Sequence, residues 1–227
     1  MSQEKEPKKS ALKWVLIGVI ILSVVVVLYA TFPNDFRIAE ELQSRGFEVH
    51  YDGQYEMIWQ HPAYYIWERP ICVTVVDQNI TQDDSRSICL LRNLKELCFI
   101  RSDISGLNWD EIVSCRVLCS LLFDDVTGFS TSELQKISAC PIVLIQFYNV
   151  QLNDSDIENI MGLKQLEWLW VDKSIGITDA SFEYLEKIAS LEKLYLVDTS
   201  VTEEGVKEFK KKRPDVEVNT TIKLYLD

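Results

Sequence analysis

The phrase LEKLYL at residues 191–196 decides the fold, because its arrangement of apolar residues recurs along the chain. Each copy follows the pattern L-x-x-L-x-L, with an aromatic or branched residue allowed at the last place. The clear upstream copies are residues 94–99, 118–123, 142–147 and 166–171. A degenerate copy begins at Ile71 and a truncated one at Val216. A period of 23 to 25 residues indicates one supersecondary unit stacked on copies of itself.

Each unit is predicted to be a strand, a turn and a helix. Apolar residues at the first, fourth and sixth places suit a short strand with one side against a core. A helical spacing follows after a polar turn, as in Phe182, Leu185 and Ile188. We expect helix N-caps at side chains that accept hydrogen bonds from free amides, and Ser130 with Glu133 has the spacing of a capping box. The expected caps are Ser105, Ser130, Asn153, Thr178 and Thr202.

The last unit resembles a known family. Residues 191–209 (LEKLYLVDTSVTEEGVKEF) are similar to leucine-rich repeats of the ribonuclease-inhibitor-like class, with their L-x-x-L-x-L-x-x-T-x-V-T-x-x-G-L pattern. The resemblance extends, more loosely, over residues 71–218. It implies an α/β fold: a right-handed leucine-rich repeat solenoid with a parallel concave sheet and convex helices. It also implies a role in protein recognition, without catalysis.

The ninth place of each unit departs from the family pattern, which often has Asn or Cys there. A hydroxyl at this place can still hydrogen-bond to the turn backbone, whereas a valine cannot. We therefore expect an irregular stretch around the two units that carry valine. The residues at this place are Ser102, Val126, Val150, Ser174 and Thr199.

Residues 14–34 contain no charged side chain and are almost wholly apolar. About 20 such residues span a bilayer core of roughly 30 Å. The run is longer than the apolar part of a secretory signal, so an uncleaved transmembrane helix is the preferred interpretation. Four lysines lie in residues 1–13, and the positive-inside rule then places this tail in the cytoplasm and the repeats outside it.

Residues 35–70 are predicted to cap the N-terminal end of the solenoid, because a terminal repeat otherwise exposes its core edge. Ile38, Ala39 and Leu42 suggest a short helix that ends near Gly46. Residues 47–51 alternate as a strand, and Asp52-Gly53 favours a two-residue hairpin turn. The remaining residues, 71–227, form the solenoid with its C-terminal cap.

Charge and composition exclude several classes of function. The formal net charge is −12, which opposes binding to nucleic acid. His50 and His61 are the two histidines of the chain, and no nucleophile motif or phosphate-binding glycine loop is present. The sequence predicts a protein that is not an enzyme, with no cofactor, metal or small-molecule substrate.

Six cysteines are present, with no C-x-x-C pair. Cys89, Cys115 and Cys140 come at comparable places before successive strands, so Cys115 and Cys140 lie within reach of a disulfide in an oxidising compartment. The alternative is that these cysteines are small apolar fillers of the interior.

The variable strand places predict one continuous surface, since alternate strand residues share a face. This surface comprises Glu96, Cys98, Ile100, Ser120, Leu122, Asp124, Leu144, Gln146, Tyr148, Trp168, Trp170, Asp172, Lys193, Tyr195 and Val197. It becomes aromatic toward the C-terminal units. Exposed aromatic clusters are typical binding anchors. Tyr148, Trp168, Trp170 and Tyr195 are therefore the candidate partner-binding residues.

The resulting prediction is a membrane-anchored protein that recognises or scaffolds an unknown protein ligand through its concave face. One alternative is a structural envelope protein that self-associates through the edge near residues 216–226. Another is a cytoplasmic ubiquitin-ligase-type adaptor, which requires the reversed topology; no F-box-like segment precedes the repeats.

Overall fold

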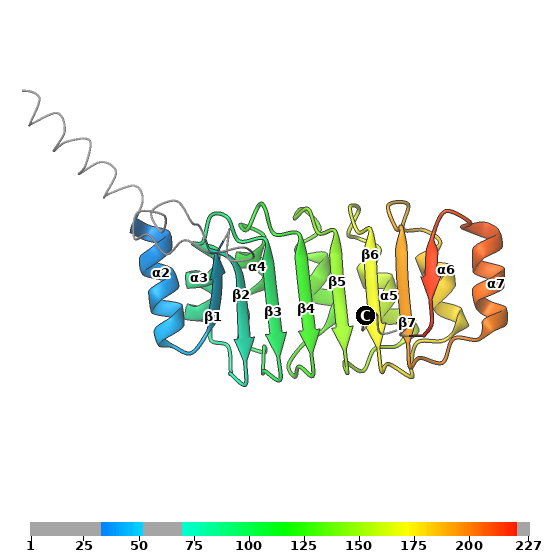
Figure 1. Ribbon diagram of the computed structural model, residues 1–227, viewed down its shortest axis with the longest axis horizontal. Coiled ribbons are helices and arrows are strands. Elements are labelled where there is room, and N and C mark those ends of the chain that lie inside the picture. Colours follow the sequence, from blue (N-terminus) through cyan, green and yellow to red (C-terminus); the bar gives the residue numbers. More distant parts are fainter. Residues whose placement is uncertain (1–32, 52–69, 222–227) are drawn as a thin grey trace, which may run out of the picture.

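The computed structural model describes residues 33–51 and 70–221, which build one eight-stranded sheet with the strands in sequence order (Figure 1). The strands β2 to β8 run parallel, and β1 pairs antiparallel with β2. Their bounds are Glu48–Tyr51 (β1), Pro70–Val76 (β2), Glu96–Ile100 (β3), Ser120–Asp124 (β4), Leu144–Tyr148 (β5), Trp168–Asp172 (β6), Lys193–Val197 (β7) and Glu217–Asn219 (β8).

The strand register confirms the repeat. Leu97 pairs with Leu121, and the same place continues through the following strands as Ile145, Leu169 and Leu194. These residues are fully buried. The strands of the five clear repeats begin at the third place of the phrase, so its first leucine lies in the preceding turn. The fourth and sixth places face the core, as the pattern predicts.

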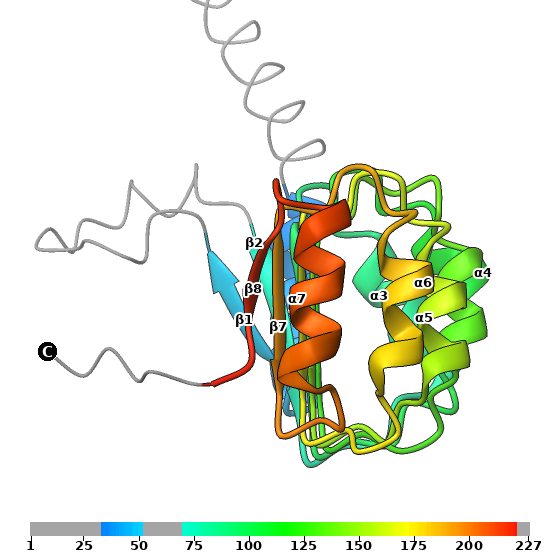
Figure 2. The same ribbon diagram turned by 90° about the vertical axis from the view of Figure 1, so that its right-hand side faces the viewer.

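The helices form a second layer. Figure 2, a view along the sheet from the C-terminal end, shows α3 to α6 together on one side of it, while α2 and α7 lie at the two ends in Figure 1. The helical segments are Pro33–Ser44 (α2), Gln82–Cys89 (α3), Trp109–Ile112 (α4), Thr131–Gln135 (η2), Asp154–Ile160 (α5), Asp179–Ser181 (η3), Phe182–Leu185 (α6) and Glu203–Lys212 (α7). The side of the sheet that faces away from α3 to α6 is called the outer face below.

Three of the five expected N-caps are confirmed. Asn153, Thr178 and Thr202 each accept a hydrogen bond from an amide of the first helical turn. Ser130 precedes a 3₁₀-helix, but its side chain makes no capping hydrogen bond, so the predicted capping box with Glu133 is wrong. Its hydroxyl lies 2.8 Å from that of Ser132 instead.

The fifth expected cap, Ser105, is also wrong. The carboxylate of Asp103 accepts the amide of Ser105 at 2.9 Å, which closes a turn at that point. Helix α4 begins four residues later, where Asn108 is the N-cap and accepts the amide of Asp110.

The ninth place behaves as expected where it carries serine. Ser102 donates to the carbonyl oxygen of Ile100 at 2.8 Å, and the Ser174 hydroxyl donates to that of Val150. The valine units show no break in the strand register, so the expected irregularity is absent from the strands. The unit of Val126 differs on the helical side, where it has the 3₁₀-helix η2.

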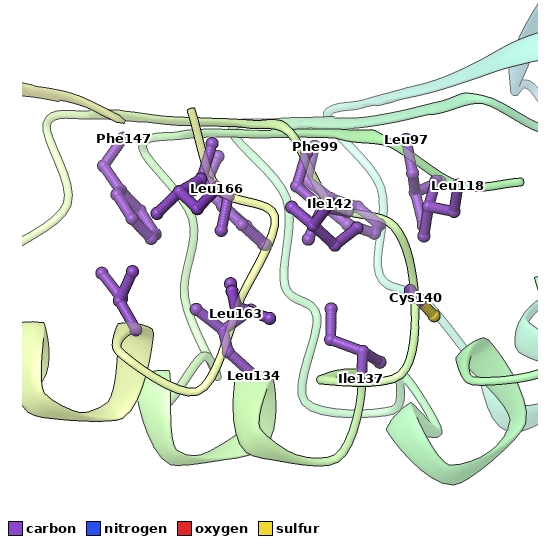
Figure 3. Close-up of a cluster of buried hydrophobic side chains, with 14 of the residues drawn as sticks. Leu97, Phe99, Leu118, Leu134, Ile137, Cys140, Ile142, Phe147, Leu163 and Leu166 are labelled. Carbon is purple, nitrogen blue, oxygen red and sulfur yellow. The ribbon is translucent and has the colours of Figure 1, made fainter. Parts of the chain in front are cut away.

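Stacked phenylalanines fill the core at the sixth place of three successive units. The ring centroids of Phe99 and Phe123 are 5.7 Å apart, and those of Phe123 and Phe147 are 5.3 Å apart. All three side chains are fully buried. Figure 3 shows Phe99 and Phe147 beneath the strands, opposite Leu134 and other apolar residues of the helical layer. The core therefore runs as one continuous strip between the layers.

The helix expected to end near Gly46 and the strand expected at residues 47–51 are present as α2 and β1. Ile38, Ala39 and Leu42 are buried on α2, and the helix is followed by Gly46 at a φ of +91°. Strand β1 then pairs with β2. The hairpin predicted at Asp52-Gly53 lies outside the described residues.

The predicted transmembrane segment, residues 14–34, also lies outside the described residues except for its last two, where α2 begins. Within residues 33–51 and 70–221, none of the helices is both long enough and apolar enough to cross a bilayer. At the other end, β8 confirms the truncated copy at residues 216–218, and residues 222–226 of the predicted edge are not described.

Candidate partner-binding face

The outer face carries the residues that strand alternation places there. On β3, for example, Leu97 and Phe99 are buried while Glu96, Cys98 and Ile100 are wholly or partly exposed. The same alternation holds on β4 and β5. All four candidate residues belong to this face: Tyr148 on β5, Trp168 and Trp170 on β6, and Tyr195 on β7.

Three of the four candidates form a continuous aromatic ladder. Trp170 and Tyr195 are register partners on neighbouring strands, and their rings stack with centroids 4.4 Å apart and an interplanar angle of 15°. Tyr148 lies diagonally across from Trp170, with centroids 5.7 Å apart and an angle of 38°. Nε2 of Gln146 donates to the Tyr148 hydroxyl at 3.0 Å. We call Tyr148, Trp170 and Tyr195 the aromatic ladder.

Trp168 is separate from this ladder. Its ring is 39% exposed, and it is paired in register with Lys193. The ammonium of Lys193 lies 4.1 Å from the centroid of the indole, which is a close cation–π contact. The outer face therefore already holds one cation over an aromatic ring.

A buried carboxylate lies beside the aromatic ladder. Asp172 follows Trp170 by two residues on β6 and is the register partner of Tyr148, yet it is only 7% exposed. Its Oδ1 atom has no hydrogen-bond partner among residues 33–51 and 70–221. Burial raises the pKa of Asp172 and the charges of Asp198 and Asp124 add to this, whereas the charge of Lys173 and a hydrogen bond from its backbone amide oppose it. Burial also raises the pKa of the Tyr148 hydroxyl.

A second polar atom nearby is unpaired. The indole Nε1 of Trp170 is buried and has no acceptor. Buried donors and acceptors normally find partners, because an unmade hydrogen bond costs about 1–3 kcal/mol. The candidate face thus combines aromatic surface with one unfilled donor and one unfilled acceptor on the same strand.

Sequence reasoning placed Asp172 on this face but did not select it as a site residue. The available signal was its position two residues after Trp170, in a strand where a carboxylate alternates with aromatic rings. Lys193 was placed there as well, and its contact with Trp168 follows only from the register of β6 and β7.

Of the two interpretations of the cysteines, the structure agrees with apolar fillers and shows no disulfide between Cys115 and Cys140. All six are free thiols, and the thiol of Cys115 hydrogen-bonds with that of Cys89, which raises the pKa of Cys115. Sγ of Cys140 instead lies 3.8 Å from the carbonyl oxygen of Ile112. Cys115 and Cys140 are buried in the core, where they act as small apolar fillers. Figure 3 shows Cys140 among the apolar side chains.

Nothing in the described ranges suggests a metal centre, since no group of three or more potential ligands lies together there. His50 is on β1, where its Nε2 lies 3.9 Å from the carboxylate of Glu48. The other histidine, His61, lies outside these ranges.

Solved structures that are similar to this chain include three leucine-rich repeat or internalin proteins. A leucine-rich repeat protein of Leptospira interrogans is 18% identical over 59% of this chain and 33% of its own, with a TM-score of 0.43. Internalin C2 of Listeria monocytogenes is 15% identical over 67% of this chain and 81% of its own, with a TM-score of 0.39. A second internalin of that species, inlF, is 14% identical over 67% of this chain and 48% of its own, with a TM-score of 0.43.

This chain therefore spans about a third of the Leptospira protein and about half of inlF. No protein-family model and no curated protein matches it. On the evidence of its own repeats, the chain folds as leucine-rich repeats: a strand, a turn and a helical segment recur in register along one parallel sheet.

Proposed function

We propose that this chain is a membrane-anchored leucine-rich repeat protein that binds a protein partner through its outer face. The observation that carries the proposal is the aromatic ladder of Tyr148, Trp170 and Tyr195 on the side of the sheet away from α3 to α6. Tyrosine and tryptophan are the side chains most enriched among the energetically dominant residues of interfaces. Trp168, with its exposed ring, extends the same surface.

The topology is part of the proposal. The apolar residues 14–34 act as an uncleaved anchor, the lysines before them stay in the cytoplasm, and the repeats face outward. The solenoid is right-handed, as nearly all parallel strand–helix–strand connections are. It belongs to the ribonuclease-inhibitor-like class, which the TSVTEEGV stretch of the last unit supports.

The ladder is also suited to binding for an energetic reason. Stacked rings lose little conformational freedom when a partner covers them, because tyrosine and tryptophan have only two side-chain torsions. The rings already restrain one another at 4.4 and 5.7 Å. The stack of Trp170 on Tyr195 is therefore preorganised before a partner arrives.

Site-specific photocrosslinking in cells that naturally produce the chain tests this function. A benzophenone residue replaces Leu144, which lies on the outer face, and in a matched control it replaces Glu158, which is exposed on α5. A partner is expected to crosslink from position 144 only. The double variant Trp170→Ala/Tyr195→Ala should reduce this product at least tenfold, whereas Ile100→Ala, on the same face but on β3, should not.

Circular dichroism of the purified variants provides the folding control. If the double variant unfolds, the rings are core residues and the proposed site is wrong. A product that contains only a second copy of this chain favours the self-associating envelope protein. Protease treatment of intact cells carrying a C-terminal tag reports the topology, and a protected tag favours the cytoplasmic adaptor.

A further inference from the structure

We propose that the partner inserts an arginine side chain between the aromatic ladder and Asp172. The inference rests on the proposed function and specifies the chemistry of the partner. The guanidinium would stack on the rings and donate to the carboxylate, while a carbonyl oxygen of the same partner segment would accept from Nε1 of Trp170. The partner is therefore a basic peptide segment.

Asp172 is the first support for this arrangement. Within the described part of the chain it takes part in no ion pair, although it is more than nine-tenths buried. The backbone of Lys173 hydrogen-bonds to this carboxylate, but Oδ1 stays unpaired. A buried carboxylate oxygen without a partner is unfavourable, and a charged hydrogen-bond donor relieves this cost. The unfilled Oδ1 atom is the acceptor that the arrangement requires.

The charges around Asp172 are mainly negative. Asp124 lies in the same cross-strand row on β4, separated from Asp172 by Tyr148 on β5. On the other side, β7 contributes Val197 to this row, and Asp198 follows it. Lys173 is the one cation among the groups that influence Asp172. The local field therefore favours an incoming cation.

The aromatic ladder selects arginine among cations. A guanidinium is planar, so it stacks on an aromatic ring and still presents its N–H groups edge-on to a carboxylate. The same face already shows the electrostatic part of this contact, because Lys193 lies over Trp168. Trp170 lies two residues further along β6, and no cation from the described part of the chain lies over its ring.

The unpaired indole nitrogen distinguishes a peptide from a free cation. Nε1 of Trp170 is a donor, so a guanidinium cannot satisfy it, but a backbone carbonyl can. Both unfilled atoms are buried, so their occupation requires one ring to turn aside. Tyr148 is half-buried and borders Asp172 in register, so we assign it as the ring that turns aside, at the cost of its hydrogen bond from Gln146.

The wider surface is consistent with a basic segment. A shallow pocket near the start of β7 and β8 includes Glu167, Glu192, Asp215 and Glu217 in its lining. The chain as a whole carries a net charge of −12. Complementary charge of this kind raises association rates and excludes acidic partners.

Titration with N-acetyl-arginine methylamide tests the inference. The full chain, in detergent micelles and labelled with ¹⁵N at tryptophan, reports on Trp170 through its indole N–H resonance, which Trp170→Phe identifies. The arginine amide should shift this resonance saturably, and the lysine amide should do so more weakly. N-acetyl-glutamate methylamide should not shift it at all.

The variant Asp172→Asn preserves shape and removes the charge, so it should weaken arginine binding at least tenfold. Asp83→Asn, on exposed helix α3, makes the same charge change and should leave binding unaltered. Tyr195→Leu, which removes the stacking ring, gives an independent variant that should also lose affinity. Equal shifts with the arginine and glutamate amides, or undiminished binding by Asp172→Asn, would overturn the inference.

The crosslinking experiment separates this inference from the proposed function. A partner that is lost with Trp170→Ala/Tyr195→Ala but retained with Asp172→Asn upholds protein recognition and refutes the arginine. Saturable binding of the arginine amide without any crosslinked partner upholds the cation site and refutes protein recognition through this face.

Discussion

Arg101 and Asp77 occupy the same position in neighbouring repeats and form a two-pronged ion pair. Nε of Arg101 donates to Oδ1 of Asp77 and Nη2 donates to Oδ2, both at 2.8 Å. Each residue directly follows a strand and has a positive φ, 53° for Asp77 and 46° for Arg101. The equivalent left-handed position recurs in every unit from β2 to β7: Asp77, Arg101, Asp125, Asn149, Lys173 and Asp198.

Replacing Arg101 should alter the titration of Asp77. The hydrogen bonds from Arg101 lower the pKa of the Asp77 carboxyl below its ordinary value of about 3.9. The pair thus stabilises the fold above that value, and the contribution is lost as the pH falls through the lowered pKa. Carboxyl-carbon NMR of Arg101→Gln should show the pKa of Asp77 return toward 3.9. An unchanged value would mean that the ion pair is absent in solution.

The residue that follows each strand has a positive φ, so glycine should be more stable there than a residue with a Cβ atom. A residue with a Cβ atom is strained there, and a β-branched one is strained most. Lys173→Val should therefore unfold at a lower urea concentration than Lys173→Gly. The free energy of unfolding of the valine variant should be lower by about 1–2 kcal/mol. Lys187, on the helical side, makes an exposed ion pair with Glu183 and lies over the ring of Tyr184. There the valine and glycine variants should show no preference for glycine.

Asp179 links two repeats through a side-chain clamp. Its carboxylate accepts the amide of Thr202 at 2.8 Å and the hydroxyl of Thr202 at 2.7 Å, and Asp154 holds Thr178 in the same way. Asp179→Ala should lower stability by about 1.5–3 kcal/mol, because bonds to a charged acceptor are lost. Chemical denaturation measures this, with Glu183→Ala as the control expected to lose less than about 0.5 kcal/mol.

Gly205 makes the same clamp testable from the opposite side. A Cβ atom at Gly205 would collide with the carboxylate of Asp179. Gly205→Ala should therefore displace this carboxylate and destabilise the chain, even though alanine is the better helix former. In the Asp179→Ala background the same change should become neutral or stabilising. A double-mutant cycle by urea unfolding checks this, and additive effects would rule out the clamp.

Asp172 predicts a pH dependence of the opposite sign to that of Asp77. Because its pKa is raised in the folded chain, the folded state binds more protons than the unfolded state between the ordinary and the raised value. Stability should then fall as the pH rises through this interval. Asp172→Asn should remove this decline and be more stable than the parent at neutral pH. Thermal melts across the pH range measure it, and parallel profiles would exclude a perturbed Asp172.

The stacked phenylalanines should contribute more to the free energy of unfolding than exposed apolar side chains do. Phe123 contacts the rings of Phe99, Phe147, Phe129 and Trp109. Phe123→Ala leaves a cavity that crosses three repeats, so a loss of about 3–5 kcal/mol is expected by denaturant unfolding. Leu90→Ala, at a side chain that is 59% exposed, should change stability by less than about 0.5 kcal/mol.

Sequence patterns within one repeat were sufficient to predict the strands but not the residue at which each helix begins. The L-x-x-L-x-L phrase located every strand of the clear repeats, because alternation with a period of two is a property of the strand itself. The helix N-caps were predicted less accurately than the strands. Ser105 and Asn108 are both acceptable by residue type, and Asp103 decides between them by binding the amide of Ser105.

The sequence by itself determined the repeat, the faces of the strands and the gathering of Tyr148, Trp168, Trp170 and Tyr195 on one of them. These follow from spacing within a unit and from the constant length of the units. Only the tertiary structure decided that Trp168 meets Lys193, that Trp170 stacks on Tyr195, and that Asp172 is buried without a partner for Oδ1. Those contacts join side chains about one repeat apart, and no local pattern encodes how neighbouring rings share the space between strands.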